Sequence, residues 1–121
     1  MRWEEEVVGL QVSIRQSADV TILDLQGRAT IGRGNDLLSS HIRKLIGDGT
    51  RNVLLNLAGV PQVDSSSLST IVRAFVSLGR QGGSLKLLCP RGSVRLVLET
   101  LHLLDVIPSF EEEAEAVASF R

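Results

Sequence analysis

The chain has 121 residues, of which 43% are hydrophobic and 3% aromatic, and its 13 Lys and Arg residues against 14 Asp and Glu residues give a formal charge of −1. This length and apolar content predict one domain around a single core and argue against a second domain. Polynucleotide is not an expected ligand, because its binders need cations to neutralise phosphates, and binders of single strands add aromatic stacking platforms.

The first residues show no sign of a targeting segment. Residues 1–6 contain three consecutive glutamates and no apolar run, so we expect no signal peptide. The longest stretch without a charged residue, 52–63, is well short of the roughly 20 apolar residues of a bilayer span. The single cysteine, Cys89, is expected to be a buried apolar side chain rather than part of a disulfide or a Cys-rich metal site. We therefore expect a cytoplasmic protein with an N-terminal extension, residues 1–9, before a domain of residues 10–121.

The domain begins with a pattern typical of two strands. Residues 10–15 and 20–25 alternate apolar and polar side chains and are rich in β-branched residues. Residues 17–19 between them (Ser-Ala-Asp) are turn formers. The sequence thus predicts an antiparallel hairpin.

A linking segment, residues 27–34, precedes the first predicted helix. Apolar residues then recur at spacings of about three and four, as on one face of an amphipathic helix. They are Leu37, Leu38, Ile42, Leu45 and Ile46. Asn35 or Asp36 is the candidate N-cap, and Gly47 is the candidate end of the helix.

The remaining segments alternate between strand and helix patterns. Residues 52–57 form a short, nearly continuous apolar run, which is typical of a central strand covered on both faces. A second helix places Leu68, Ile71, Val72, Phe75 and Gly79 on one side and ends at residues 81–83. The strand at 84–88 is closed by Pro90, and the following helix has Val94, Val97, Leu98 and Leu101 on its expected buried side.

The chain is predicted to end with a short strand and an acidic helix. Val106 and Ile107 form the candidate strand. Residues 111–119 form the candidate helix, with Ala114, Val117 and Ala118 as its docking residues. The acidic run in this helix is interpreted as a solvated face. The order ββαβαβαβα predicts an α/β domain with a mixed sheet, antiparallel in the opening hairpin and parallel afterwards, and about four helices.

Several kinds of chemistry find no support in the sequence. The glycine-rich segment 27–34 lacks the Gly-Lys-Ser/Thr ending of a phosphate-binding loop, and no dinucleotide fingerprint follows a strand. His102 and Asp105 are a poor metal site by themselves, and His41 is distant in sequence. No nucleophile elbow is present for serine hydrolase chemistry. We expect no enzyme activity, no metal and no cofactor.

The most informative segment is residues 60–68 (Val-Pro-Gln-Val-Asp-Ser-Ser-Ser-Leu), between a predicted central strand and a helix. Open α/β sheets place functional groups at the carboxyl ends of their strands. Asp64 and the three serines suit a helix cap, because their side chains satisfy free backbone N–H groups. A serine here is also a candidate phosphate acceptor, since the first turn of a helix tolerates an anion. Both interpretations remain open on these residues alone.

The segment from Asn56 to Leu68, with the striped helix after it and the Gly-Gly-Ser-Leu-Lys-Leu run at 82–87, resembles the STAS domain of bacterial anti-sigma factor antagonists. The resemblance extends from Leu10 to about Phe120, and its distinctive part is Asp-Ser-Ser followed by Leu68. It implies a regulatory phosphoprotein that acts in transcription. In that family the serine after the aspartate is phosphorylated by an anti-sigma factor that is also a serine kinase. The resemblance therefore implies Ser65 as the acceptor, with Ser66 as the alternative.

The chain differs from the family pattern at three places. Ser67 stands at the position of the family's glycine. The usual Gly-Glu-Leu-Asp after the second strand reads Gly-Arg-Ala-Thr at residues 27–30, so two acidic positions are lost. Asn56 stands where an aspartate is common.

The leading hypothesis is an anti-sigma factor antagonist that binds an anti-sigma factor with serine kinase activity and is switched off by phosphorylation. It does not act on nucleic acid directly or insert into a membrane. The predicted partner surface combines the loop after the second strand with the first turns of the second helix. Its residues are Gly27, Arg28, Thr30, Ile31, Asp64, Ser65, Ser66, Ser67, Ser69 and Arg73.

Two other functions are compatible with the sequence. One is a STAS scaffold subunit of a lipid-transport or stressosome-like complex that uses no phosphoserine switch. The other is a small anion- or nucleotide-binding α/β domain that uses the loop at Ser65. A constitutive partner would support the first, and stabilisation or turnover with nucleotides would support the second.

Overall fold

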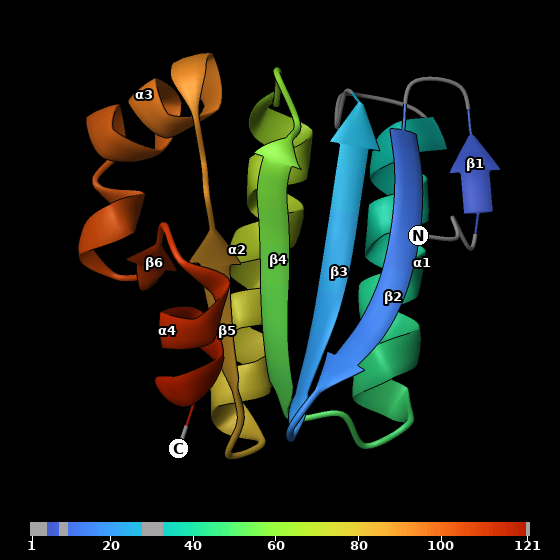
Figure 1. Ribbon diagram of the computed structural model, residues 1–121. Helices are drawn as coiled ribbons and strands as arrows, with labels where there is room; N and C mark the ends of the chain where they lie inside the picture. The colour runs from blue at the N-terminus through green and yellow to red at the C-terminus, as the bar shows by residue number, and fades with distance from the viewer. Residues whose placement is uncertain (1–4, 8–9, 28–32, 121) are drawn as a thin grey trace.

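The computed structural model describes residues 5–7, 10–27 and 33–120, which form an α/β domain with one mixed sheet. Within these ranges the sheet has six strands, in the order β1-β2-β3-β4-β5-β6. They are β1 (Glu5–Val7), β2 (Leu10–Ser17), β3 (Val20–Gly27), β4 (Asn52–Gly59), β5 (Ser84–Leu88) and β6 (Ser109–Phe110). β2 is antiparallel to both of its neighbours, β1 and β3, and β3 to β6 are parallel (Figure 1). The predicted α/β class with a mixed sheet is confirmed.

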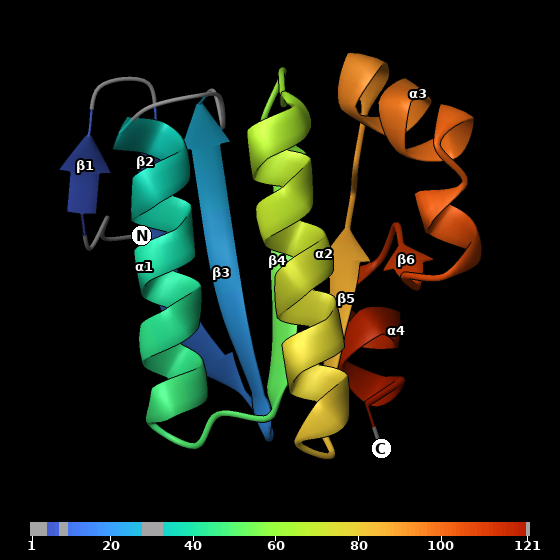
Figure 2. The same ribbon diagram turned by 180° about the vertical axis from the view of Figure 1, so that it is seen from behind.

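The helices cover the two faces of the sheet unequally. The helical elements in the described ranges are α1 (Arg33–Gly47), α2 (Ser65–Arg80), α3 (Gly92–Thr100), the 3₁₀ turn η1 (Leu103–Asp105) and α4 (Glu113–Ala118). The long helices α1 and α2 lie side by side on one face, and the short α4 lies on the other (Figures 1 and 2). At the edge far from β1, α3 and η1 extend past β5 (Figure 2). Each face of the central strands is therefore covered.

The apolar core divides into two clusters, one on each face. The larger lies between the sheet and α1 and α2, and it includes Leu23, Leu55, Leu38 and Ile71. The smaller lies under α4 and is formed by Val20, Ile22, Leu54, Leu88, Cys89 and Ala116. Neighbouring residues of β4, Leu54 and Leu55, enter different clusters, which explains the continuous apolar run of this strand. Cys89 is a buried, free thiol, as expected.

Most predicted elements agree with the structure. The opening hairpin pairs Ser17 with Val20, so its turn lies where the turn formers predict it. The predicted central strand is β4, and the second helix is α2, which ends at Arg80 just before the predicted stop. Its core residues include Leu78 rather than the predicted Gly79, which is exposed. In α3 the predicted buried side also holds one exception, because Leu101 is 55% exposed.

The predicted strand at Val106 and Ile107 is wrong. The Ile107 N–H donates to the Leu103 carbonyl at 2.8 Å. This turn therefore engages a backbone N–H that pairing with a neighbouring strand would require. Val106 is 61% exposed, whereas Ile107 is 1% exposed and enters the core from the turn. The strand that pairs with β5 is β6, formed by the two residues Ser109 and Phe110.

Three further predictions need correction. The first helix begins at Arg33, before the two candidate N-caps Asn35 and Asp36, although it ends at Gly47 as predicted. The last helix begins at Glu113, so Ala116 is buried against the sheet while Ala114 and Ala118 are exposed. Sequence patterns also missed β1, whose three residues hold two glutamates and carry no strand signal.

A polar network lies on the α4 face of the sheet. The Arg15 Nε donates to the Asp24 Oδ2 at 2.5 Å, and its Nη1 donates to the Glu113 Oε2 at 2.9 Å, with a second contact between the Arg15 Nη2 and the Glu113 Oε1. The Asn56 Nδ2 donates to the Asp24 Oδ1 at 2.7 Å. Asp24 is buried, so its charge is stabilised by these donors rather than by water. The network joins three neighbouring strands to the last helix.

Replacing Asn56 by aspartate, the residue common in the family, should destabilise this chain. An aspartate cannot donate to Asp24 and would place a second carboxylate beside it. We expect Asn56→Asp to lower the free energy of unfolding at pH 7 by about 1–3 kcal/mol. Urea unfolding measures this loss, and Gln62→Glu is the control for added charge, because Gln62 is exposed and its amide forms no hydrogen bond within the described residues. Equal stability of Asn56→Asp and wild type would contradict the role assigned to the amide.

Protonation of Glu113 should loosen α4 in acid. The Arg15 guanidinium holds the pKa of Glu113 below its ordinary value through its hydrogen bonds. A depressed folded-state pKa contributes stability that is present above the unfolded pKa of about 4.3 and is lost as the pH falls through the folded value. Glu113→Gln should therefore flatten the decrease of unfolding free energy below about pH 4.5, whereas the exposed Glu115→Gln should not. Urea titrations across this pH range compare the two variants, and identical profiles would contradict the prediction.

Candidate functional site

The site begins with the cap of α2. Asp64 is the N-cap, with extended backbone at φ −124°, and its Oδ1 accepts hydrogen bonds from the Ser66 and Ser67 backbone N–H groups, each at 3.1 Å. These contacts satisfy two of the N–H groups that a helix leaves free at its start. The cap fixes Ser65 as the first residue of the helix.

Ser67 completes a capping box. Its Oγ accepts from the Asp64 backbone N–H at 3.1 Å and donates to the Asp64 carbonyl oxygen at 3.1 Å. The side chain is 0% exposed. A glycine, which the family places here, could make neither contact. Ser67 therefore serves the start of the helix and presents no surface to a partner, which corrects its prediction as a surface residue.

The other two serines have different environments. The half-buried Ser66 donates from its Oγ to the Asp64 Oδ1 at 2.7 Å. Ser65 is exposed, and its hydroxyl forms no hydrogen bond within the described residues. Both the cap and the phosphate-acceptor interpretations of the segment thus find candidates, but on different residues.

The electrostatic environment of Ser65 suits an added anion. The N-terminus of a helix carries a partial positive charge, and α2 has no acidic residue in its first turn. The nearest carboxylate in sequence, Asp64, is engaged with the N–H groups of Ser66 and Ser67. A phosphoryl group on Ser65 would face solvent at this positive end of the helix.

A shallow pocket of about 450 Å³ adjoins Ser65. Its lining comes from α2, from the residue after α3 and from η1: Ser65, Leu68, Ser69, Val72, Arg73, Leu101 and Leu103. The structure thus brings the predicted residues Ser69 and Arg73 to the same surface as Ser65. Sequence reasoning missed Leu101 and Leu103, because it assigned Leu101 to the core. The exposed Leu101 thus adds an apolar side chain to the lining that contains Ser65.

The predicted partner loop is described in part. Gly27 ends β3 with φ 104°, a backbone conformation that favours glycine, and it lies at the same edge of the sheet as the end of β4 (Figure 1). Arg28, Thr30 and Ile31 lie outside the described residues.

The described residues offer little for metal binding. Within the part of the chain that the structure describes, no three His, Cys, Asp or Glu side chains gather into a candidate metal site. His102 and Asp105 form an exposed pair, with 3.2 Å between the Nδ1 and Oδ2 atoms. None of the described helices is long and apolar enough to cross a bilayer.

Replacing Ser67 and replacing Ser65 should have different effects on the free energy of unfolding. Ser67→Ala removes the return half of the capping box and leaves the Asp64 N–H without this acceptor, so it should cost about 1 kcal/mol. Ser65→Ala removes an exposed hydroxyl and should change the unfolding free energy by less than about 0.5 kcal/mol. Urea unfolding of both variants tests this contrast. Equal losses of unfolding free energy for the two substitutions would contradict the assignment of the capping role to Ser67 and not to Ser65.

Comparisons with known proteins identify the family. The model of the STAS domain matches residues 11–116, and no curated protein matches. Among solved structures, an anti-sigma factor antagonist from Mycobacterium paratuberculosis is 17% identical with a TM-score of 0.79, and the match covers 93% of this chain and 94% of that one.

Two further solved structures have the same fold. The phosphorylated form of the Bacillus cell fate determinant SpoIIAA is 19% identical with a TM-score of 0.72, covering 91% of this chain and 99% of that one. A STAS domain protein from Planctomyces limnophilus is 21% identical with a TM-score of 0.74, covering 91% and 97%. These similarities agree with the fold, and the family model covers most of the sequence. The chain belongs to the STAS domain family, as its Asp-Ser-Ser motif and strand order predicted.

Proposed function

We propose that this chain is an anti-sigma factor antagonist that binds an anti-sigma factor with serine kinase activity, and that phosphorylation of Ser65 ends this binding. The observation that carries the proposal is that the three serines have different hydrogen bonds and different exposure. Ser66 and Ser67 hold the cap, whereas the Ser65 hydroxyl is exposed and not engaged within the described residues. Ser65 can therefore be modified without breaking the start of α2, and Ser66 is the alternative acceptor.

Charge explains how one modification could act as a switch. A phosphoserine carries a charge of about −1.5 to −2 at pH 7. The free chain can hold this charge, because it faces solvent at the positive end of α2. A partner seated on Ser65 would remove that water and leave the charge desolvated, which is costly unless the partner pairs it. A change from 99:1 to 1:99 occupancy requires about 5.5 kcal/mol of differential affinity, and such burial can supply several kilocalories.

Two further residues of the predicted surface lie near Ser65. Ser69 and Arg73 line the same pocket as Ser65, and the exposed Leu101 adds an apolar side chain to that lining. Protein interfaces combine apolar contacts at their centre with polar residues at their rim. The solved relatives support the proposal further, since one is an anti-sigma factor antagonist and another was solved in a phosphorylated form.

The proposed protein is a cytoplasmic bacterial phosphoprotein that regulates transcription through another protein. It performs no catalysis itself, because the kinase belongs to the partner. A STAS scaffold in a lipid-transport or stressosome-like complex would instead hold its partner whatever the state of Ser65. A nucleotide-binding domain would be stabilised by ATP alone. The two alternatives thus predict different outcomes for the experiment below.

The test compares Ser65→Ala, Ser65→Asp and the phosphorylated chain in binding to a panel of anti-sigma factor kinases. We expect Ser65→Ala to retain wild-type affinity, and Ser65→Asp to bind at least about tenfold more weakly, a loss of about 1.4 kcal/mol. The phosphorylated chain should lose more, because its charge is larger. Ser17→Asp, in the β2–β3 hairpin at the end of the sheet where β4 begins, controls for added charge and should bind like wild type.

Mass spectrometry of the chain after incubation with a binding kinase and ATP identifies the acceptor. Modification at Ser65 supports the proposal, and modification at Ser66 alone would overturn the assignment of the acceptor. Equal affinities of Ser65→Ala, Ser65→Asp and the phosphorylated chain would reject the switch in favour of the scaffold function. Thermal stabilisation by ATP in the absence of any kinase would favour the nucleotide-binding function.

A further inference from the structure

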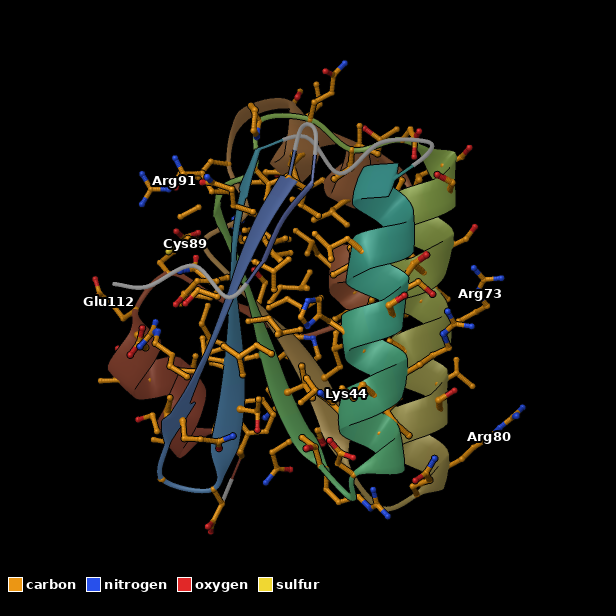
Figure 3. All side chains as sticks on the ribbon, turned by 90° about the vertical axis from the view of Figure 1, so that its right-hand side faces the viewer. Lys44, Arg73, Arg80, Cys89, Arg91 and Glu112 are labelled. Carbon is orange, nitrogen blue, oxygen red and sulfur yellow. The ribbon has the colours of Figure 1, made fainter. Side chains whose placement is uncertain are left out.

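Exposed residues of α2 form a ridge that starts at Ser65. At 100° per residue, the exposed positions Ser65, Ser69, Arg73, Val76 and Arg80 lie within one side of the helix. No Asp or Glu occurs anywhere in α2. Arg73 and Arg80 extend away from the body of the domain (Figure 3). The helix that begins at the proposed switch therefore presents only positive charge along its exposed side.

A groove of about 370 Å³ runs between α1 and α2, beside this ridge. Both helices line it, with Ser39, Ile42, Arg43 and Ile46 from α1 and Thr70, Arg73, Ala74 and Ser77 from α2. The half-buried Ile46, with the buried Ile42 and Ala74 beside it, gives the groove an apolar floor, whereas the two arginines are exposed. Small side chains on α2 keep the groove open. It thus combines an apolar centre with a cation on each helix.

The arginines of this groove differ from Arg15 and Arg95, which carboxylates neutralise. Arg15 forms ion pairs with Asp24 and Glu113, and Arg95 forms ion pairs with Glu99 and Glu111. Within the described residues neither Arg43 nor Arg73 forms an ion pair, and the lining of the groove contains no carboxylate. Two cations that no acidic side chain of the groove neutralises are an electrostatic complement to acidic groups on another molecule.

We infer that this groove binds an acidic segment of the protein partner, with carboxylates against Arg43 and Arg73 and apolar side chains on the floor between them. The inference rests on the proposed function and specifies the chemistry of the partner. A protein segment is favoured over a polyphosphate or a nucleic acid, because a chain of phosphates has no apolar group to pack on the floor that includes Ile42 and Ala74. The segment continues along the ridge toward Ser65.

This arrangement would strengthen the switch. Arg73 follows Ser65 by eight residues, which is about 12 Å along a helix axis. This is the separation of the backbones, and the side chains of both residues line one pocket. A phosphate on Ser65 adds negative charge where the acidic segment approaches the start of α2, so the same complementarity that attracts the partner makes the phosphate repel it.

The first experiment needs no identified partner. The probe is an amphipathic helical peptide with Glu on one face and Leu on the other, and its control replaces every Glu by Gln. In NMR titrations of the isotopically labelled chain, the Glu peptide should shift the resonances of Ser39, Arg43, Thr70, Arg73 and Ser77, which line the groove. The Gln peptide should leave them unchanged, and about 0.5 M salt should abolish the shifts, because screening weakens exposed charge pairs.

Charge reversal localises the interaction. The double variant Arg43→Glu, Arg73→Glu should bind the Glu peptide, and any kinase that binds wild type, at least about tenfold more weakly. The double variant Lys44→Glu, Arg51→Glu is the control matched in charge, because both residues are exposed and neither lines the groove. It should keep affinity close to that of wild type. Retained NMR spectra of both variants exclude a loss of fold as the cause.

The outcomes separate this inference from the proposed function. If a kinase binds in a manner that depends on Ser65 but is indifferent to the two arginines, the groove inference is overturned and the switch stands. If no kinase binds but the Glu peptide fills the groove, the switch is overturned and the groove stands. Tighter binding of inorganic polyphosphate than of the Glu peptide at the same residues would overturn the inference, as would concentration-dependent dimerisation through the groove.

Discussion

The carboxylate of Asp64 decides what the rest of the site can do. Its Oδ1 accepts hydrogen bonds from the backbone N–H groups of Ser66 and Ser67. These contacts fix the start of α2 after the loop that follows β4. Because the cap is complete without Ser65, the hydroxyl of this first helical residue forms no hydrogen bond within the described residues. If all three hydroxyls were needed for capping, modification of any one of them would destabilise the helix. Here the surplus hydroxyl lies at the positive end of a helix.

A second polar arrangement, on the opposite face of the sheet, fixes the end of the chain. Asp24 is buried in the middle of the sheet, where an unpaired charge would be strongly destabilising. Arg15 and Asn56 supply its donors, and Arg15 also holds Glu113 at the start of α4. Asn56 and the family's aspartate are thus not interchangeable in this chain, because the Asn56 amide donates a hydrogen bond to the buried Asp24 carboxylate. The two faces differ in kind, since Arg15 is paired with carboxylates on one, whereas Arg43 and Arg73 on the other are exposed and unpaired within the described residues.

How far the sequence predicts this structure depends on how local each signal is. Alternation and turn formers suffice for the hairpin, and the double coverage of β4 is visible as an unbroken apolar run. Val106 and Ile107 misled the prediction, because two apolar residues fit a turn as well as a strand, and only the Ile107 N–H, which donates to Leu103, decides between them. The division of the three serines was also beyond sequence reasoning, since cap partners depend on the backbone angles at Asp64.

The sum of charges conceals how they are distributed. A formal charge of −1 gives no indication of a charged surface. Yet the acidic residues of the C-terminal region lie at α4 and before it, where Arg15 and Arg95 neutralise Glu113 and Glu111. The cations at the groove between α1 and α2 have no such partners within the described residues. Net charge governs long-range attraction, but recognition depends on which charges lack a partner at a contact.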